Sequence, residues 1–136
     1  MATGATGNME LLSVLVVEDN AFTSMTVRKT LQSLGVGRIS AANNGREALE
    51  FLDSEDARPD VILMDLRMPG MGGLELMGRL KDRRYTGYVI VTSGVDEETM
   101  NAVQDIALDS NINVLGFLPK PLTAKVLGEL LEAAIG

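Results

Sequence analysis

The ten residues VILMDLRMPG, from Val61 to Gly70, decide the fold class of this chain. They open with four consecutive apolar side chains, which is typical of a strand covered on both faces. An acid, Asp65, follows at once, and Pro69 and Gly70 then interrupt regular structure. In open parallel sheets, ligands bind beyond the carboxyl ends of the strands. The stretch therefore predicts a buried parallel strand that leads into a functional loop.

Similar short apolar runs recur along the chain and alternate with segments of helical period. Strands are predicted over 13–17, 38–42, 61–64, 88–93 and 114–118. Helices are predicted over 20–34, 45–52, 73–83, 97–111 and 123–135. Strict strand–helix alternation of this kind predicts a doubly wound α/β sandwich with right-handed crossovers.

The spacing of apolar residues also predicts which helical side chains face the sheet. Asn20 is expected to cap the first helix, and Gly35 to end it. The inward-facing residues are expected to be Phe22, Met25, Val27, Leu31 and Leu34 in the first helix, Leu74, Met77 and Leu80 in the third, and Leu127, Leu130, Leu131 and Ala134 in the fifth.

Length and hydropathy set the organisation of the chain. Its 136 residues are the size of one domain, which we expect over 12–136 behind a flexible tail at 1–11. The apolar runs are too short to span a bilayer, and no secretory signal is visible, so a cytoplasmic protein is expected.

Composition removes several chemistries. The chain has no Cys and no His, which excludes thiolate nucleophiles, disulfides, Ser-His-Asp catalysis and the common zinc sites. Its net charge of −7 would repel phosphate backbones, so direct nucleic-acid binding is not expected. Carboxylates, hydroxyls, lysine and the backbone remain to carry the function.

Reactive side chains follow four of the five predicted strands. Glu18 and Asp19 come after the first, Asp65 after the third, the hydroxyls of Thr92 and Ser93 with Gly94 end the fourth, and Lys120-Pro121 follows the fifth. Oxygen ligands without His or Cys suit a hard ion such as Mg²⁺. With Mg²⁺ and Lys120 neutralising the pocket, Asp65 is the natural nucleophile for an aspartyl-phosphate. The Glu18–Asp19 pair is expected both to cap the first helix and to bind metal.

These motifs, in this order, resemble the receiver domain of two-component response regulators. The resemblance rests on VVEDN at 16–20, MDLRMPGM at 64–71, the Thr-Ser-Gly after the fourth strand, and Lys120-Pro121. It implies a flavodoxin-like fold, a three-layer sandwich with strand order 2-1-3-4-5. It also implies a phosphoprotein that receives its phosphoryl group from a sensor histidine kinase or a phosphotransfer protein. The expected downstream partner is an effector or a fused output domain, and a homodimer is a further expected assembly.

The resemblance assigns a role to each site residue. Asp65 is the implied phospho-acceptor, and Lys120 contacts the phosphoryl group. The implied metal ligands are Asp19, Glu18 through water, Asp65 and the Arg67 carbonyl. The switch pair is Phe117 with Ser93 or Thr92, and the structural positions are Gly94 and Pro121, the latter with a cis peptide. Ser93 is favoured over Thr92, because Gly94 would then allow close phosphate approach. The output surface is expected over 97–111, 114–118 and 123–135.

Two departures from the usual receiver pattern stand out. Glu18 replaces a more common Asp, and the segment 94–114 is several residues longer than usual. That longer segment is similar to receivers joined to cyclic-di-GMP phosphodiesterase outputs.

The sequence is expected to encode a phospho-accepting switch that is not a turnover enzyme, and three other functions are alternatives to it. A haloacid-dehalogenase-type phosphatase needs an Asp-x-Asp pair, but Arg67 and Ala21 occupy the second position after Asp65 and Asp19. A nucleotide-binding fold needs a glycine-rich loop after the first strand, which is missing. The third alternative is a pseudo-receiver that docks partners without phosphorylation.

Overall fold

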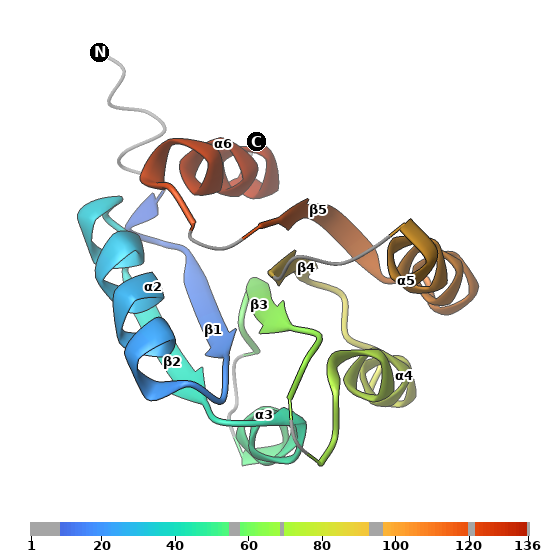
Figure 1. Ribbon diagram of the computed structural model, residues 1–136. Helices are drawn as coiled ribbons and strands as arrows, with labels where there is room; N and C mark the ends of the chain where they lie inside the picture. The colour runs from blue at the N-terminus through green and yellow to red at the C-terminus, as the bar shows by residue number, and fades with distance from the viewer. Residues whose placement is uncertain (1–8, 55–57, 69, 93–96, 120–121, 136) are drawn as a thin grey trace.

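Five strands alternate with five helices in the computed structural model, which describes residues 9–54, 58–68, 70–92, 97–119 and 122–135 (Figure 1). The strands are β1 (Ser13–Val17), β2 (Arg38–Ala42), β3 (Val61–Asp65), β4 (Tyr88–Thr92) and β5 (Asn113–Leu118). The helices are α2 (Ala21–Ser33), α3 (Gly45–Ser54), α4 (Gly73–Asp82), α5 (Glu97–Ser110) and α6 (Ala124–Ile135). The predicted element order is confirmed, with boundaries that move by a few residues.

The strands form one parallel sheet in the order β2-β1-β3-β4-β5, as the resemblance implies. β3 continues one residue beyond its predicted end, because Asp65 still pairs with Thr92 of β4. The register between β4 and β5 shifts between Val89 and Ile90, which places an irregularity in the edge strand.

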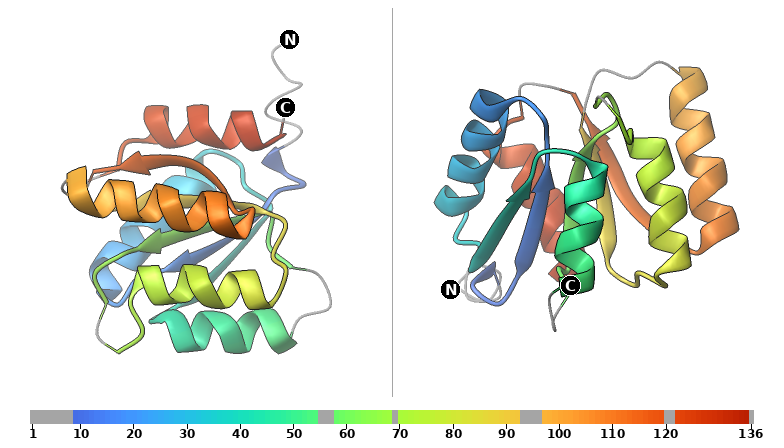
Figure 2. Two further views of the ribbon diagram at one scale, coloured as in Figure 1. Left: turned by 90° about the vertical axis from the view of Figure 1, so that its right-hand side faces the viewer. Right: turned by 90° about the horizontal axis from the view of Figure 1, so that it is seen from below.

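Helices cover both faces of the sheet and create two separate cores. Figures 1 and 2 show α3, α4 and α5 on one face and α2 and α6 on the other. Along β3, Ile62 and Met64 pack toward the first group of helices, whereas Val61 and Leu63 pack toward α2 and α6. This alternation is the period of two that a pleated strand imposes, and it explains why the strand is apolar on both sides.

The predicted inward faces of two helices are partly wrong. Phe22 and Met25 of α2 are 72% and 40% exposed, while the buried residues of that helix are Ser24, Val27 and Leu31. These three follow the i, i+3, i+7 spacing of a helix face, which turns Phe22 and Met25 outward.

The predicted buried face is partly wrong in α4, the third predicted helix, and correct in α6, the fifth. Leu74 of α4 is 37% exposed and Leu76 takes the core position instead, beside the correctly predicted Met77 and Leu80. The inward face predicted for α6 is confirmed: Leu127 and Leu131 are fully buried, and Leu130 and Ala134 pack against the same core.

The packed part of the chain begins inside the segment expected to be a flexible tail. Met9 is only 4% exposed, and its carbonyl accepts hydrogen bonds from the N–H groups of Leu12 and Gly37, each at 3.1 Å. The expectation of a flexible tail over 1–11 is therefore wrong at Met9, and residues 1–8 lie outside the described part.

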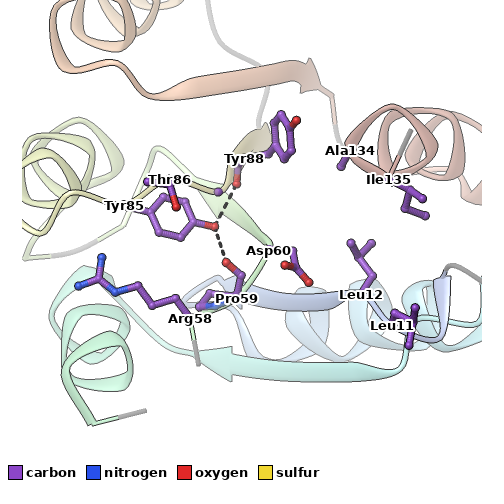
Figure 3. A pocket seen from close by; sticks show the side chains of 11 residues that line it. Leu11, Leu12, Arg58, Pro59, Asp60, Tyr85, Thr86, Tyr88, Ala134 and Ile135 are labelled. Atoms are coloured by element: carbon purple, nitrogen blue, oxygen red, sulfur yellow. Dashed lines mark hydrogen bonds between the residues drawn. The ribbon is translucent and has the colours of Figure 1, made fainter. Parts of the chain in front are cut away.

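A cavity of about 530 Å³ lies at the amino ends of β1, β3 and β4 (Figure 3). Its wall includes Tyr85, whose hydroxyl donates to the Pro59 carbonyl at 2.9 Å, and Asp60, whose carboxylate accepts from the Ser13 N–H at 2.9 Å. Burial raises the pKa of the Tyr85 phenol well above its ordinary value. This cavity is at the opposite edge of the sheet from Glu18, Asp19 and Asp65.

At Gly73, the first residue of α4, the helix lies very close to the loop that follows β3. A Cβ at Gly73 would lie 2.8 Å from the Leu66 Cα and 3.1 Å from the Asp65 carbonyl oxygen. We expect Gly73→Ala to lower the free energy of unfolding by about 1–3 kcal/mol, because backbone has to move. Gly78 of the same helix has open space around it, so Gly78→Ala should be neutral or stabilising by up to about 1 kcal/mol. Urea denaturation of both variants measures the difference, and equal stabilities would contradict the close approach.

Candidate functional site

Three carboxylates meet at the carboxyl ends of β1 and β3. Val17 and Met64 are register partners in these neighbouring parallel strands, so the residues that follow them, Glu18 and Asp65, emerge side by side. One carboxylate oxygen each from Glu18, Asp19 and Asp65 lies within 4.8 Å of the other two. The predicted convergence of these acids is confirmed.

The backbone holds two of the three carboxylates in place. The Asn20 N–H donates to Glu18 Oε2 at 3.0 Å, and the Arg67 N–H donates to Asp65 Oδ1 at 2.9 Å. In both cases the donor is two residues after the acid, in the turn that leaves the strand. Glu18 and Asp65 are 3% and 4% exposed, whereas Asp19 is exposed. The site is thus anchored at its base and open at Asp19.

The donor set fits a hard divalent cation. Carboxylate oxygens are the ligands that Mg²⁺ and Ca²⁺ prefer, and Mg²⁺ typically takes only a few of them and keeps several waters. Three negative groups this close repel one another, and a cation between them removes that repulsion.

The cap of α2 is Asn20, as predicted. Its Oδ1 accepts the Thr23 N–H at 2.9 Å. The Glu18 carboxylate accepts a hydrogen bond from the Asn20 N–H, just before the helix, and capping of α2 by the Glu18–Asp19 pair stays a prediction. Because the helix begins at Ala21, the residue directly before it is the one whose short side chain reaches the first turn.

Thr92 lies against the acidic cluster from the next strand. It ends β4 as the register partner of Asp65, it is 4% exposed, and its hydroxyl donates to the Met64 carbonyl at 3.3 Å. Ser93 and Gly94, which follow it, lie outside the described residues.

The remaining predicted residues are described in part. Phe117 of β5 is half-buried, pairs in register with Val91 and packs against the α3–α5 core. The Arg67 side chain is exposed and its N–H is bonded to Asp65, while metal binding by its carbonyl remains a prediction. Lys120 and Pro121 lie outside the described residues, so their roles and the cis peptide also remain predictions.

Sequence reasoning missed the backbone donors of this site. The Asn20 and Arg67 N–H groups were not predicted to hold the acids, although an acid two residues before a turn or cap position is a recognisable signal. An apolar groove next to Thr92 was also missed, because it is lined by threonines, which look polar in the sequence.

A family model of the response regulator receiver domain matches residues 14–132, which is most of the chain. The chain belongs to the response regulator receiver family. This receiver domain is therefore part of a family of signalling switches, with the flavodoxin-like strand order 2-1-3-4-5. The haloacid-dehalogenase and nucleotide-binding alternatives have no support from this family.

Relatives of this receiver include single-domain and longer proteins. The chemotaxis protein CheY1 of Helicobacter pylori is 32% identical over 126 residues, which cover 92% of this chain and 98% of CheY1. The positive alginate biosynthesis regulatory protein of Pseudomonas aeruginosa is 33% identical over 125 residues, covering 90% of this chain but only 47% of that protein. The chain thus spans about half the length of the alginate regulator.

A solved structure agrees with the fold. The chemotaxis protein CheY4 of Vibrio cholerae matches with a TM-score of 0.74 and 28% identity, covering 90% of this chain and 98% of that one. No helix among the residues described in our structure has the length and apolar character needed to cross a membrane.

The like charges at the site give a stability test. In the presence of a chelator, Asp19→Asn should raise the free energy of unfolding by about 1 kcal/mol, because it removes one charge from a crowded, partly solvated cluster. Added Mg²⁺ should stabilise the unmodified domain and stabilise Asp19→Asn less. Thermal denaturation with and without Mg²⁺ measures both effects.

Asp105→Asn is the matched control, because Asp105 is an exposed acid on α5. It should keep the full response to Mg²⁺. An equal response in Asp19→Asn would show that the cation does not use this cluster.

Proposed function

We propose that this receiver domain accepts a phosphoryl group on Asp65 from a sensor histidine kinase or a phosphotransfer protein. One Asp65 oxygen would form the new O–P bond while the N–P bond of the donor phosphohistidine breaks. The observation that carries the proposal is the position of Asp65, held by the Arg67 N–H and grouped within 4.8 Å of Glu18 and Asp19. Membership of the receiver family supports the same donor class.

The acidic cluster is the proposed Mg²⁺ site. Asp19 and Asp65 would bind the ion directly, with Glu18 acting through water and the Arg67 carbonyl completing the set. When bound, the cation supplies positive charge that makes a phosphoryl dianion acceptable beside three carboxylates. Lys120 is proposed to supply a second positive charge at the phosphoryl oxygens.

Thr92 is the switch hydroxyl that the described geometry supports. Register partners on adjacent parallel strands point to the same face, so Thr92 and Asp65 share a face of the sheet. Sequence reasoning favoured Ser93, and Ser93 stays a competing prediction. On phosphorylation, the Thr92 hydroxyl would move from the Met64 carbonyl to the phosphoryl group. This movement would shift the balance between two conformations of β5 and Phe117 toward the active one.

The proposed output surface is formed by α5, β5 and α6. Four consecutive β5 residues, Val114 to Phe117, are only half-buried, and Leu108 on α5 is 81% exposed. This surface would bind a downstream effector or an output domain joined to the receiver, and a cyclic-di-GMP phosphodiesterase is the output class predicted from the sequence. We propose a switch and not a turnover enzyme, acting in the cytoplasm without direct nucleic-acid contact.

The mass of the intact protein tests phosphorylation directly. After incubation with acetyl phosphate and Mg²⁺, intact mass spectrometry should show an adduct of about 80 Da on the unmodified chain. Asp65→Asn should show none, because an amide cannot take its place as nucleophile, and chelation of Mg²⁺ should suppress the adduct. Asp105→Asn serves as the control that keeps it. An adduct that survives Asp65→Asn would show that Asp65 is not the acceptor, and the absence of an adduct with every small donor and kinase would favour the pseudo-receiver.

The switch hydroxyl can be tested by a matched pair of variants at one position. Thr92→Val keeps the shape of the side chain but removes its hydroxyl, whereas Thr92→Ser keeps the hydroxyl. We expect Thr92→Val to be phosphorylated on Asp65 yet to lose most of the NMR shift changes at Phe117 that phosphorylation causes, and Thr92→Ser to retain them. If Ser93→Ala loses those changes and Thr92→Val does not, Ser93 is the switch.

A further inference from the structure

Helix α2 carries an apolar face that no part of the described chain covers. Phe22 is 72% exposed and Met25 is 40% exposed, one turn apart on the helix that begins just after the acidic cluster. Single exposed apolar residues are ordinary on a protein surface. Here the exposed ring stands directly beside a groove.

That groove has a volume of about 280 Å³ and a mainly apolar lining. Its walls are formed by Phe22, Thr23, Thr26, Val27, Thr30, Thr92 and Leu122. The Thr26 and Thr30 hydroxyls donate to the carbonyls one turn earlier, each at 3.0 Å. Because these hydroxyls are satisfied within the helix, the threonines offer mainly methyl groups to anything that enters. The groove is suited to an apolar or aromatic side chain.

Opposite charges stand at the two ends of this face. Asp19 precedes α2, Lys29 lies near its other end, and both are exposed. Relative to the level of Ser24, Lys29 lies about 7 Å further along the helix, whereas Asp19 lies on the other side of that level, just before the extended cap residue Asn20. When two such helices lie antiparallel and cross at that level, Asp19 of each meets Lys29 of the other.

We propose that this face pairs with a second copy of the chain through antiparallel α2 helices. Phe22 of each copy enters the groove of the other beside Thr26, and the Lys29 ammonium of each faces the Asp19 carboxylate of the other. A two-fold interface requires the same patch to carry both halves of every contact. The α2 face meets this condition for the apolar contact and for the charges.

The size of the face sets the strength of the pairing. A single helix face buries less surface than the standard stable interface, so the dimer is weak and depends on protein concentration. It goes beyond the phosphorylation proposal, because it does not require Asp65 to be modified. It does engage Asp19, so the dimer and a cation at the acidic cluster compete for the same carboxylate.

Sedimentation of the full chain over a wide range of concentrations tests the pairing. The unmodified chain should move toward a dimer as its concentration rises. Phe22→Ser should weaken association about tenfold or more, because a central aromatic anchor is lost. Leu11→Ser is the control: Leu11 is also strongly exposed, at 82%, but it lies just before β1, away from α2, so its replacement should leave the dimer unchanged. Circular dichroism confirms that both surface variants are folded.

A charge exchange tests the antiparallel orientation. Lys29→Asp should weaken the dimer by roughly threefold or more, and adding Asp19→Lys should restore it, because the pair is then reversed and again complementary. A monomer at every concentration would overturn the proposal, as would a dimer that Phe22→Ser does not weaken. If Phe22→Ser slows phosphoryl transfer from a kinase without changing the oligomeric state, the face belongs to the phosphodonor. That outcome would overturn the pairing while leaving phosphorylation of Asp65 intact.

Discussion

The register between β1 and β3 is the constraint on which the rest of the site depends. Val17 pairs with Met64, and this single alignment delivers Glu18 and Asp65 to the same edge of the sheet. A slip of one residue would turn the side chains of one strand to the opposite face and separate the two acids. The apolar side chains of β1 and β3 fix the alignment, since both faces of these strands are buried.

The two cores hold the acids together against their mutual repulsion. Residues on one side of β3 pack under α3, α4 and α5, and those on the other side pack under α2 and α6, so the strand has no freedom to withdraw. The turns beyond the strands then add one backbone donor to each buried acid. The carboxylate cluster is therefore prepared by the scaffold before any cation binds. Such preparation is what a site needs when catalysis depends on positioning and charge.

The sequence did not predict the buried face correctly in helices that carry apolar residues on two faces. Phe22 and Met25 have the correct spacing for a buried face, yet Ser24, a smaller residue, occupies the core position. In α4 the choice between Leu74 and Leu76 had the same character. The packing of Met9 was not predicted, because the residues before it look like a tail and its contact is with the distant Gly37. In each case a neighbouring element decided what the local pattern left open.

The sequence by itself determined the alternation of strands and helices, the burial of the central strands and the acids at their ends, because each is written in local patterns of apolar and polar residues. The tertiary structure decided the rotation of α2 and α4, the pairing of Asp65 with Thr92 and the apolar groove behind the threonines. These features depend on which segments meet across the sheet. Contacts between distant segments leave no periodic trace in a single chain.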